Sequence, residues 1–225
     1  MPYFQTDSTT ITDTTEENIS EMYNKGFVFT RVEKGNMIQT RSLRVNLSNF
    51  ELSSENRRIL KKNEDLELDV KKLPLENYSW EIHALGKDFY TKKFGEGTMS
   101  ASKIKEMFQE QDKSNMNSVF VYSIQGKNIG YCLSYINPEI VHYAYPFYNL
   151  EVPKERSLGL AMMTKAILWS KENGKKYIYL GSVTDSKAFY KLQFKGLEWW
   201  DNSNNSWNQD ISHLKSATLV EVALN

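Results

Sequence analysis

Residues 156 to 161 have the types and order of a helix start that binds an anion. The segment fits R-x-x-G-x-A and consists of Arg156, Ser157, Leu158, Gly159, Leu160 and Ala161. The first amides of a helix have no internal partner and carry partial positive charge, a glycine lets a ligand approach the backbone, and an arginine adds a charged donor. The pattern predicts a site for a phosphate or pyrophosphate. An ordinary N-cap at Ser157 beside a surface arginine is the alternative.

A second group of reactive side chains lies in the segment AFYKLQF, residues 188–194. It places Tyr190 and Lys191 on a short predicted helix that follows an apolar strand, with aromatic residues at helical spacing. We interpret Phe189 and Phe194 as core residues. A solvated surface lysine is the alternative interpretation of Lys191.

Basic residues gather in the predicted helix SSENRRILKKNEDL, in two adjacent strips. They are Arg57, Arg58, Lys61 and Lys62. Such side chains can contact successive phosphates of a nucleic acid, and binding of this kind depends strongly on salt. A solvated helix face is the alternative.

The three histidines do not have the spacing of a metal site, and the single cysteine, Cys132, lies in an apolar run. One thiol excludes an internal disulfide framework and a zinc or iron–sulfur site with several cysteines. We interpret Cys132 as a small buried apolar residue. His142, in the tyrosine-rich segment HYAYPFYN, is a candidate base, with a hydrogen-bonded structural histidine as the alternative.

The composition is that of a globular protein without a membrane anchor. The chain has 225 residues, 28 basic and 28 acidic side chains, and 40 % hydrophobic residues, which predicts a packed core. No apolar run reaches the roughly 20 residues needed to span a bilayer, and the N-terminus lacks the basic and apolar regions of a signal peptide. We therefore expect a soluble, cytoplasmic protein with no membrane partner, as a monomer or weak dimer.

The predicted elements that position these residues change in type along the chain. The first half alternates a helix capped by Thr14 or Thr15, the strands FVFTRV and IQTRSLRVNL, and three further helices. The second half contains three strand-like runs joined by tight turns, the helix after Ser157, the strand KYIYLGS, the short helix of Tyr190, the strand LEWWD and a last strand in ATLVEVALN. A meander followed by helix, strand, helix and strand predicts an α+β fold with a mixed sheet.

The R-x-x-G-x-A segment and the placement of Tyr190 together resemble the GNAT acyltransferase fold. In that fold the loop amides hold the pyrophosphate of acyl-CoA, and a tyrosine at this place often acts as the general acid. The resemblance implies a GNAT-like, mostly antiparallel mixed sheet flanked by helices. We expect this core at residues 113–225, a lobe of helices and strands at 15–112, and a flexible N-terminus at 1–14.

A closer resemblance, to the arginyl- and leucyl-tRNA–protein transferases, runs from about residue 15 to residue 207. The shared residues are, in order, Arg44, Val45, Phe50, Ser53, Arg57, Arg58, Lys61, Asn63, the segment HYAYPFYN, Ser157-Leu158-Gly159, Tyr179-Leu180-Gly181, Tyr190-Lys191, Phe194, Glu198 and Trp207. The chain departs from the family pattern in three places. It has no cysteine cluster before the strand of Arg44, it has Gly196 where a proline is usual, and no acid follows Tyr145.

This resemblance implies an enzyme that moves arginine or leucine from charged tRNA to the N-terminal α-amine of an acceptor with an acidic first residue, as a mark for degradation. The ester is already activated, so no metal or tightly bound cofactor is required. The enzyme must hold a neutral amine about 3–3.5 Å from the ester carbonyl and exclude water. By resemblance, residues 156–161 hold the phosphate of the donor's terminal adenosine, and the basic helix holds the acceptor arm of the tRNA.

The candidate catalytic residues are Tyr190, Lys191 and His142. Tyr190 would donate to the leaving ribose oxygen, while Lys191 and Arg44 would bind the acidic acceptor residue, because a carboxylate needs a cation in fixed geometry. The candidate pocket residues are Tyr143, Tyr145 and Tyr148, and core packing or strand propensity is the alternative for each of them. Two other functions stay open: an acetyl-CoA-dependent N-acetyltransferase and a non-catalytic relative that binds tRNA or a degron.

Overall fold

Internal contacts divide the chain into two units, and the computed structural model describes residues 6–224. The first unit contains the residues up to 53, residues 137–142 and the residues from 170 onward; the second contains 54–136 and 143–169. Each unit is discontinuous in sequence, because strand β8 (Ile140–Tyr148) and helix α5 (Leu158–Glu172) contribute residues to both. The division expected at residues 112 and 113 stays a prediction.

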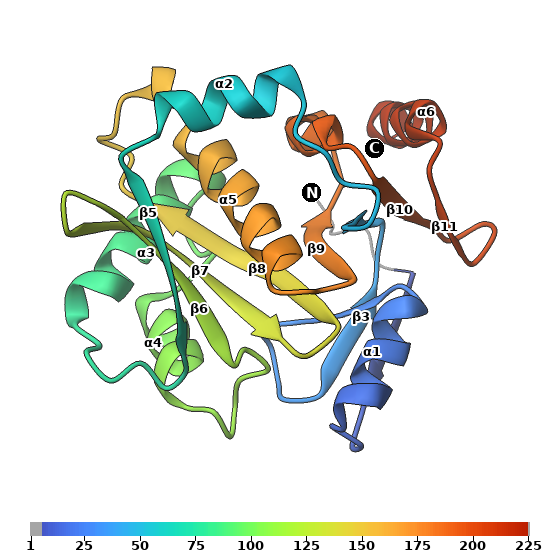
Figure 1. The fold of residues 1–225 in the computed structure, drawn as a ribbon. Helices are drawn as coiled ribbons and strands as arrows, with labels where there is room; N and C mark the ends of the chain where they lie inside the picture. Colours follow the sequence, from blue (N-terminus) through green and yellow to red (C-terminus); the bar gives the residue numbers. More distant parts are fainter. Residues whose placement is uncertain (1–5, 225) are drawn as a thin grey trace. The chain divides into compact units, whose positions relative to one another are not determined.

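The second unit contains the strands β5, β6 and β7, which pair antiparallel in that order, and most of β8, which lies next to β7 (Figure 1). The bounds of the first three are Leu66–Lys72, Ser118–Ile124 and Lys127–Ile136. The β6–β7 hairpin turns at Gln125 and Gly126, which both have positive φ, as the sequence Gln-Gly-Lys-Asn predicts. Strand β5 was missed, although its segment LELDVKK carries its less exposed side chains at alternate positions from Leu66 to Val70.

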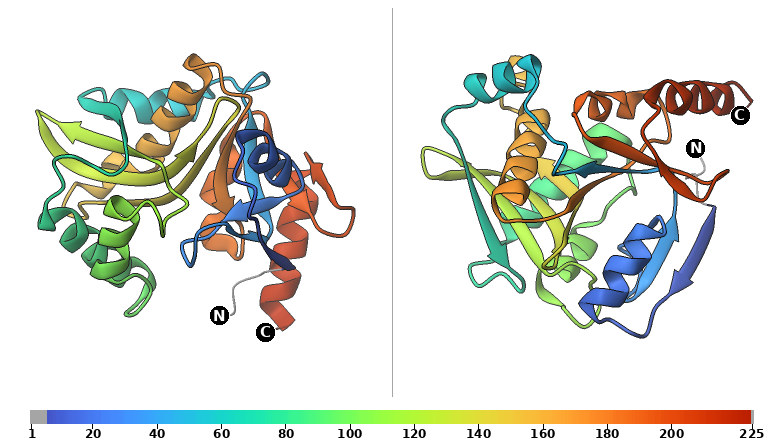
Figure 2. Two further views of the ribbon diagram at one scale, coloured as in Figure 1. Left: turned by 90° about the horizontal axis from the view of Figure 1, so that it is seen from below. Right: turned by 45° about the vertical axis from the view of Figure 1, so that its right-hand side comes forward.

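Helices cover both faces of these strands (Figure 2). The helices of this unit are α2 (Ser54–Lys62), α3 (Trp80–Phe94), α4 (Ala101–Gln109), the short 3-10 helix η1 (Lys154–Arg156) and most of α5. Neighbouring residues of β7 point to opposite faces of the sheet. On one face, the ring centre of Tyr131 lies 6.1 Å from that of Phe108 in α4. On the other face, a Cβ at Gly130 would lie 3.0 Å from Met162 of α5. The glycine therefore lets α5 approach the sheet closely.

The first unit contains a three-stranded sheet ordered β1-β3-β2 and a second sheet ordered β11-β10-β4-β9 that continues into the start of β8. The elements are β1 (Asp7–Thr10), α1 (Glu16–Asn24), β2 (Phe27–Phe29), β3 (Asn36–Gln39), β4 (Ser42–Asn46), β9 (Tyr177–Ser182), the 3-10 helix η2 (Ser186–Gln193), β10 (Leu197–Asp201), β11 (Ser206–Asn208) and α6 (Ile211–Leu224). Within this unit β8 and β9 run parallel and the other strand pairs antiparallel. Mostly antiparallel, mixed sheets with flanking helices confirm the predicted α+β class.

Two predicted strands of this unit differ from the structure. The segment IQTRSLRVNL is not one strand: it breaks after Gln39, so that β3 and β4 belong to different sheets. The tail ATLVEVALN was predicted as a strand, and this was wrong for the described residues, which form α6. The carboxylate of Asp210 accepts from the amides of Ser212 and His213 at 2.9 and 3.2 Å and so caps the helix. A short apolar run does not by itself distinguish a strand from a helix.

The N-terminal helix and the segment before it were also predicted from sequence. Helix α1 begins after Thr15, whose hydroxyl accepts from the amide of Asn18, as expected of one of the two candidate caps. Residues 7–10, within the segment expected to be flexible, pair with β3 as strand β1. Residues 1–5 lie outside the described residues.

Candidate functional site

A buried asparagine fixes the turn before α5 to the end of α2. Asn63 is fully buried. Its Nδ2 donates to the carbonyl of Ile59 at 2.9 Å and to the carbonyl of Arg156 at 2.7 Å. Its Oδ1 accepts from Nε of Arg156 at 3.1 Å. Since both ends of this amide are used, the backbone and side chain of Arg156 have one position relative to α2.

Arg156 also forms an ion pair with Asp65. One terminal nitrogen of the guanidinium donates to Oδ2 at 3.2 Å, and the other pairs with Oδ1. The hydrogen bond from Arg156 holds the pKa of the Asp65 carboxyl below its usual value. The sequence predicts a charge-assisted contact from Arg156 to a ligand phosphate, and this stays a prediction. The charge of Arg156 is shared with a carboxylate, and its geometry indicates that it positions the turn.

Two backbone amides at the start of α5 have no acceptor within residues 6–224. Ser157 is left-handed, with φ 52° and ψ 46°. Its carbonyl accepts from the amides of Leu160 and Ala161 at 3.0 and 3.1 Å, and its own amide is used by the preceding turn. Among residues 6–224, nothing accepts from the amides of Leu158 and Gly159. The sequence predicts a phosphate site over the six residues 156–161. In the structure, two of their amides are available as donors, at the N-terminus of a 15-residue helix.

The predicted pocket residue Tyr148 lies directly against this turn. A Cβ at Gly159 would lie 3.0 Å from Cε1 of Tyr148 and 3.1 Å from its hydroxyl oxygen. The ring is held from its other side by Phe89, at 4.8 Å between centroids. Burial raises the pKa of the Tyr148 hydroxyl, so the group is protonated and can donate at neutral pH. A side chain at position 159 would press on the Tyr148 ring, which would have to move by a few tenths of an ångström.

The basic side chains of α2 lie beside the same turn. Arg57, Arg58, Lys61 and Lys62 are all exposed, as predicted. Helix α2 is anchored instead by Asn56 and Ile59, which are buried. Nζ of Lys62 donates to the carbonyl of Glu155 at 3.3 Å, and Arg58 pairs with Glu55. The basic helix and the start of α5, separated by about a hundred residues in sequence, are therefore neighbours in the second unit.

The other two predicted pocket tyrosines differ from Tyr148. Tyr143 is 2 % exposed and its ring packs 6.0 Å from that of Phe120, so it is a core residue and not a pocket residue. Tyr145 is half-buried. Cys132 is fully buried, as predicted, and burial raises the pKa of its thiol.

In the first unit, the guanidinium of Arg44 forms hydrogen bonds with protein groups and packs against two aromatic rings. Its Nε donates to the Glu198 carboxylate at 2.7 Å, and a terminal nitrogen donates to Asn24 at 3.1 Å and to the Tyr179 hydroxyl at 3.4 Å. The guanidinium carbon lies 3.9 Å from the ring centre of Tyr177 and 4.1 Å from that of Trp207. The prediction that Arg44 binds an acceptor carboxylate needs correction, because a buried glutamate of the chain already occupies it.

His142 has the surroundings of a structural histidine. Its Nδ1 lies 2.8 Å from the hydroxyl of Tyr23, which accepts in turn from the amide of Phe29. Nδ1 and the hydroxyl share this hydrogen bond, and the tautomer of His142 decides which of them donates. Burial lowers the pKa of His142 to about 3. These contacts favour the structural alternative over the candidate base.

The two remaining candidates lie on η2. Tyr190 is 49 % exposed, the highest value among the large aromatic side chains of the first unit that the structure describes. Nζ of Lys191 donates to the carbonyl of Ser182 at 3.2 Å and lies 3.4 Å from where a Cβ of Gly181 would be. Burial lowers the pKa of Lys191 to about 8. Lys191 is therefore not the solvated lysine of the alternative interpretation.

Sequence reasoning gave no role to three residues that hold these clusters together. They are Asn63, Asp65 and Glu198. Asn63 and Glu198 were already present among the residues shared with the resembling family, and this was the signal that could have found them. Asp65 carried no such signal.

Within residues 6–224, no group of three or more His, Cys, Asp or Glu side chains is placed to hold a metal ion. Within the same part of the chain, no helix has the length and apolar character to cross a membrane.

Comparisons with known proteins connect this arrangement to one family. The family described as "Arginine-tRNA-protein transferase, C terminus" matches residues 76–201. An aspartate/glutamate leucyltransferase of Azorhizobium caulinodans is 28 % identical over 167 residues, which cover 68 % of this chain and 66 % of that protein. The chain thus spans slightly less than two thirds of the length of this relative.

Two solved structures are similar to this chain at low sequence identity. The C-terminal domain of a putative lysylphosphatidylglycerol synthetase from Agrobacterium fabrum is 13 % identical, with a TM-score of 0.51 over 91 % of this chain and 70 % of that one. The L-PGS structure from Bacillus licheniformis is 15 % identical, with a TM-score of 0.47 over 77 % and 54 %. The first of these similarities supports the GNAT-like acyltransferase fold expected from the sequence.

Proposed function

The chain belongs to the arginine-tRNA-protein transferase family, and from this we propose that it moves an amino acid from the 3′ end of a charged tRNA to the N-terminal α-amine of an acceptor protein. The leucyltransferase of A. caulinodans supports leucine as the donated residue and aspartate or glutamate as the first residue of the acceptor. Arginine is the alternative donor. The cytoplasm, where charged tRNA is made, is the proposed location.

One observation carries this proposal: the two open amides of α5 lie beside an exposed basic helix. The amides of Leu158 and Gly159 can bind one phosphate, at the positive end of a long helix. The strip of α2 can bind further phosphates, and Asn63 connects the two places. A small acyl donor would need only the two amides of α5. A nucleic acid with a reactive end uses both these amides and the strip of α2.

The proposed chemistry is direct aminolysis of the aminoacyl ester. The nitrogen of the neutral α-amine attacks the ester carbonyl, the amide bond forms, and the ester bond to the ribose oxygen breaks. The ribose oxygen then needs a proton, and Tyr190 is our candidate donor; the proton that the attacking nitrogen loses on becoming an amide nitrogen returns to the tyrosine oxygen, so no net proton is gained or lost. The protonated hydroxyl of Tyr148 lies beside the donor turn, where we propose that it orients the terminal nucleotide.

Lys191 is our candidate for binding the acidic first residue of the acceptor. With a pKa near 8 it is cationic at neutral pH, and its bond to the Ser182 carbonyl fixes the ammonium while leaving two N–H donors. Arg44 is no longer a candidate, because Glu198 already neutralises it.

The test is transfer from tRNA to a peptide. The protein is incubated with labelled Leu-tRNA or Arg-tRNA and a peptide that starts with aspartate, and in parallel with acetyl-CoA. Peptide labelling from tRNA alone supports the proposal. Thiol release from acetyl-CoA would establish an N-acetyltransferase instead, and tRNA binding without transfer would establish a non-catalytic relative.

A pair of matched variants tests whether the basic side chains of α2 bind tRNA. Arg57→Gln with Lys61→Gln removes two charges from the strip of α2. Lys92→Gln with Lys113→Gln removes two exposed, ion-paired charges elsewhere in the same unit. The α2 variant should bind tRNA more weakly than the control, with a shallower dependence on salt. Equal behaviour of the two variants would remove the basic helix from the donor site.

A further inference from the structure

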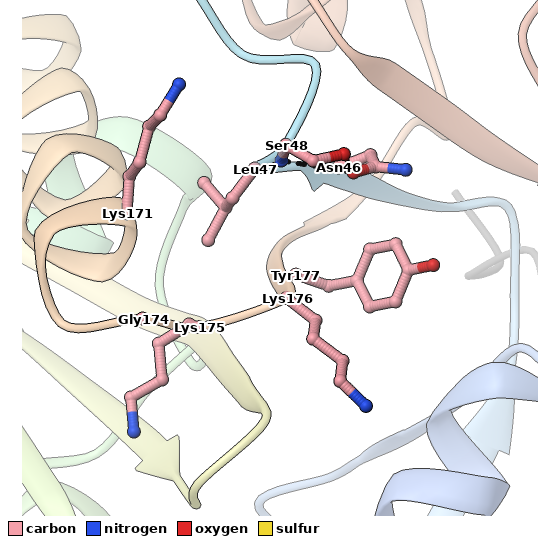
Figure 3. Close-up of a pocket in the computed structure, with 8 residues that line it drawn as sticks. All are labelled: Asn46, Leu47, Ser48, Lys171, Gly174, Lys175, Lys176 and Tyr177. Atoms are coloured by element: carbon pink, nitrogen blue, oxygen red, sulfur yellow. Dashed lines mark hydrogen bonds between the residues drawn. The ribbon is translucent and has the colours of Figure 1, made fainter.

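The first unit carries a hollow of about 450 Å³ whose wall is basic. Eight residues line it: Asn46, Leu47, Ser48, Lys171, Gly174, Lys175, Lys176 and Tyr177. Three of the eight are lysines, and none of these described residues is acidic. Figure 3 shows the three ammonium groups spread around the hollow, each extending in a different direction.

The backbone that carries the lysines is fixed from three sides. The amide of Lys175 donates to the carbonyl of Ser170 at 3.0 Å, which closes the end of α5. The amide of Lys176 donates to the carbonyl of Glu139 at 2.7 Å, and its carbonyl accepts from Leu47 at 3.0 Å. The backbone positions of Lys175 and Lys176 are therefore set by these hydrogen bonds.

Two of the three ammonium groups are hydrogen-bonded to neutral atoms. Nζ of Lys171 donates to the carbonyl of Phe50, and Nζ of Lys175 donates to the carbonyl of Asn137, both at 2.6 Å. A carbonyl fixes an ammonium group without cancelling its charge. The ammonium group of Lys176 pairs with the Glu139 carboxylate, and that pair is exposed, while the lining of the hollow holds three lysines and no acidic residue. The hollow therefore has net positive charge.

Neutral donors and an aromatic ring complete the wall. The side-chain oxygen of Asn46 accepts from the hydroxyl of Ser48 at 2.7 Å. The side-chain nitrogen of Asn46 points away from Ser48 and is a donor (Figure 3). Tyr177 rests with one ring face on the guanidinium of Arg44. Spread cations beside an aromatic ring are the combination that binds the backbone and bases of a single RNA strand.

We propose that this lysine hollow binds the phosphate backbone of RNA and is a second contact of the tRNA donor. The inference rests on the proposed function. An RNA strand is favoured over a small phosphate compound because the three ammonium groups are spread and not convergent, and because the hollow is open. Each contacted phosphate releases a counterion, so affinity should fall steeply with salt.

Matched charge removals test the site. The hollow variant is Lys171→Gln with Lys176→Gln, in which glutamine keeps an N–H donor. The control is Lys25→Gln with Lys195→Gln, two exposed lysines of the same unit that pair with Glu21 and Glu51. Binding of uncharged tRNA is measured over a salt series. Loss of two phosphate contacts should lower the salt slope by about 1.4–1.8 and weaken binding at 0.1 M salt by roughly tenfold or more; equal slopes for both variants would overturn the proposal.

A second measurement needs no variant. Lysine acetylation is followed in the wild-type chain with and without tRNA. Lys171 and Lys176 should be protected by tRNA, while Lys25 and Lys195 should not. Protection of all four equally, or protection by inorganic pyrophosphate as effective as that by tRNA, would overturn the assignment. If wild-type protein transfers amino acids from tRNA but the hollow is unprotected, this inference fails while the proposed function stands; if no transfer occurs, the proposed function fails by itself.

Discussion

Replacing Arg44 by alanine should destabilise the first unit by about 3–5 kcal/mol, because the change leaves the Glu198 carboxylate buried and without its ion-pair partner. Both side chains are 8 % exposed, so solvent cannot replace the guanidinium. The same change also removes the donor to the buried hydroxyl of Tyr179. A loss of this size is a large share of the 5–15 kcal/mol typical of a folded protein, so the variant should be close to unfolding.

Urea denaturation followed by tryptophan fluorescence measures this loss, since Trp207 lies on the guanidinium of Arg44. Arg44→Lys keeps the charge but not the planar fork, and should lose roughly 1.5–3 kcal/mol. Arg44→Met with Glu198→Leu should regain part of the alanine loss, because no charge is then left buried. The reasoning would be refuted by an Arg44→Ala protein of near wild-type stability that no longer distinguishes peptides starting with aspartate from peptides starting with asparagine. That result would make Arg44 the acceptor-binding cation.

Three further changes test the two units. Since burial lowers the pKa of Lys191 to about 8, the preference in kcat/KM for an aspartate peptide over an asparagine peptide should fall as the pH rises through 8. The Lys191→Arg variant stays charged and should show a preference that is constant over this range. A wild-type preference that does not change with pH would contradict the proposed role of Lys191. Asn63→Ala removes three hydrogen bonds and should lower the free energy of unfolding by about 2–4 kcal/mol in urea; a loss below 1 kcal/mol would mean that the turn is held by other contacts. Gly159→Ala puts a methyl group 3.0 Å from the Tyr148 ring and should destabilise by roughly 1–2 kcal/mol in thermal unfolding, whereas the same change with Tyr148→Leu should stabilise; destabilisation in both backgrounds would mean that another contact requires the glycine.

Local signals in the sequence were sufficient for most of the elements. The hydroxyl of Thr15 caps α1, and the Gln125-Gly126 turn joins β6 to β7, because each depends only on residues a few positions apart. The strand predicted in ATLVEVALN was wrong because that prediction also used only local signals. The apolar residues of this segment fit a strand or a helix, and the cap at Asp210 decides between the two.

Pairings between distant residues could not be read from the sequence. Arg44 has the residue type and place of a carboxylate-binding cation, yet Glu198, 154 positions later, neutralises it. Arg156 fits the anion-binding pattern, but Asp65 and Asn63 come from another part of the chain. The partial burial of Lys191 is likewise a tertiary property, because it depends on contacts with Gly181 and Ser182 of β9. The family resemblance identified these positions without giving their roles.

The most direct test of the donor site is nuclear magnetic resonance of the backbone amides at the start of α5. Isotope-labelled protein is titrated with an amide-linked analogue of the leucylated terminal nucleotide of tRNA, which cannot be hydrolysed as an ester. The amide protons of Leu158 and Gly159 should move to lower field as they bond to the phosphate, while that of Ala161, already bonded to Ser157, should not. Saturable binding of the analogue with both resonances unchanged would contradict the account.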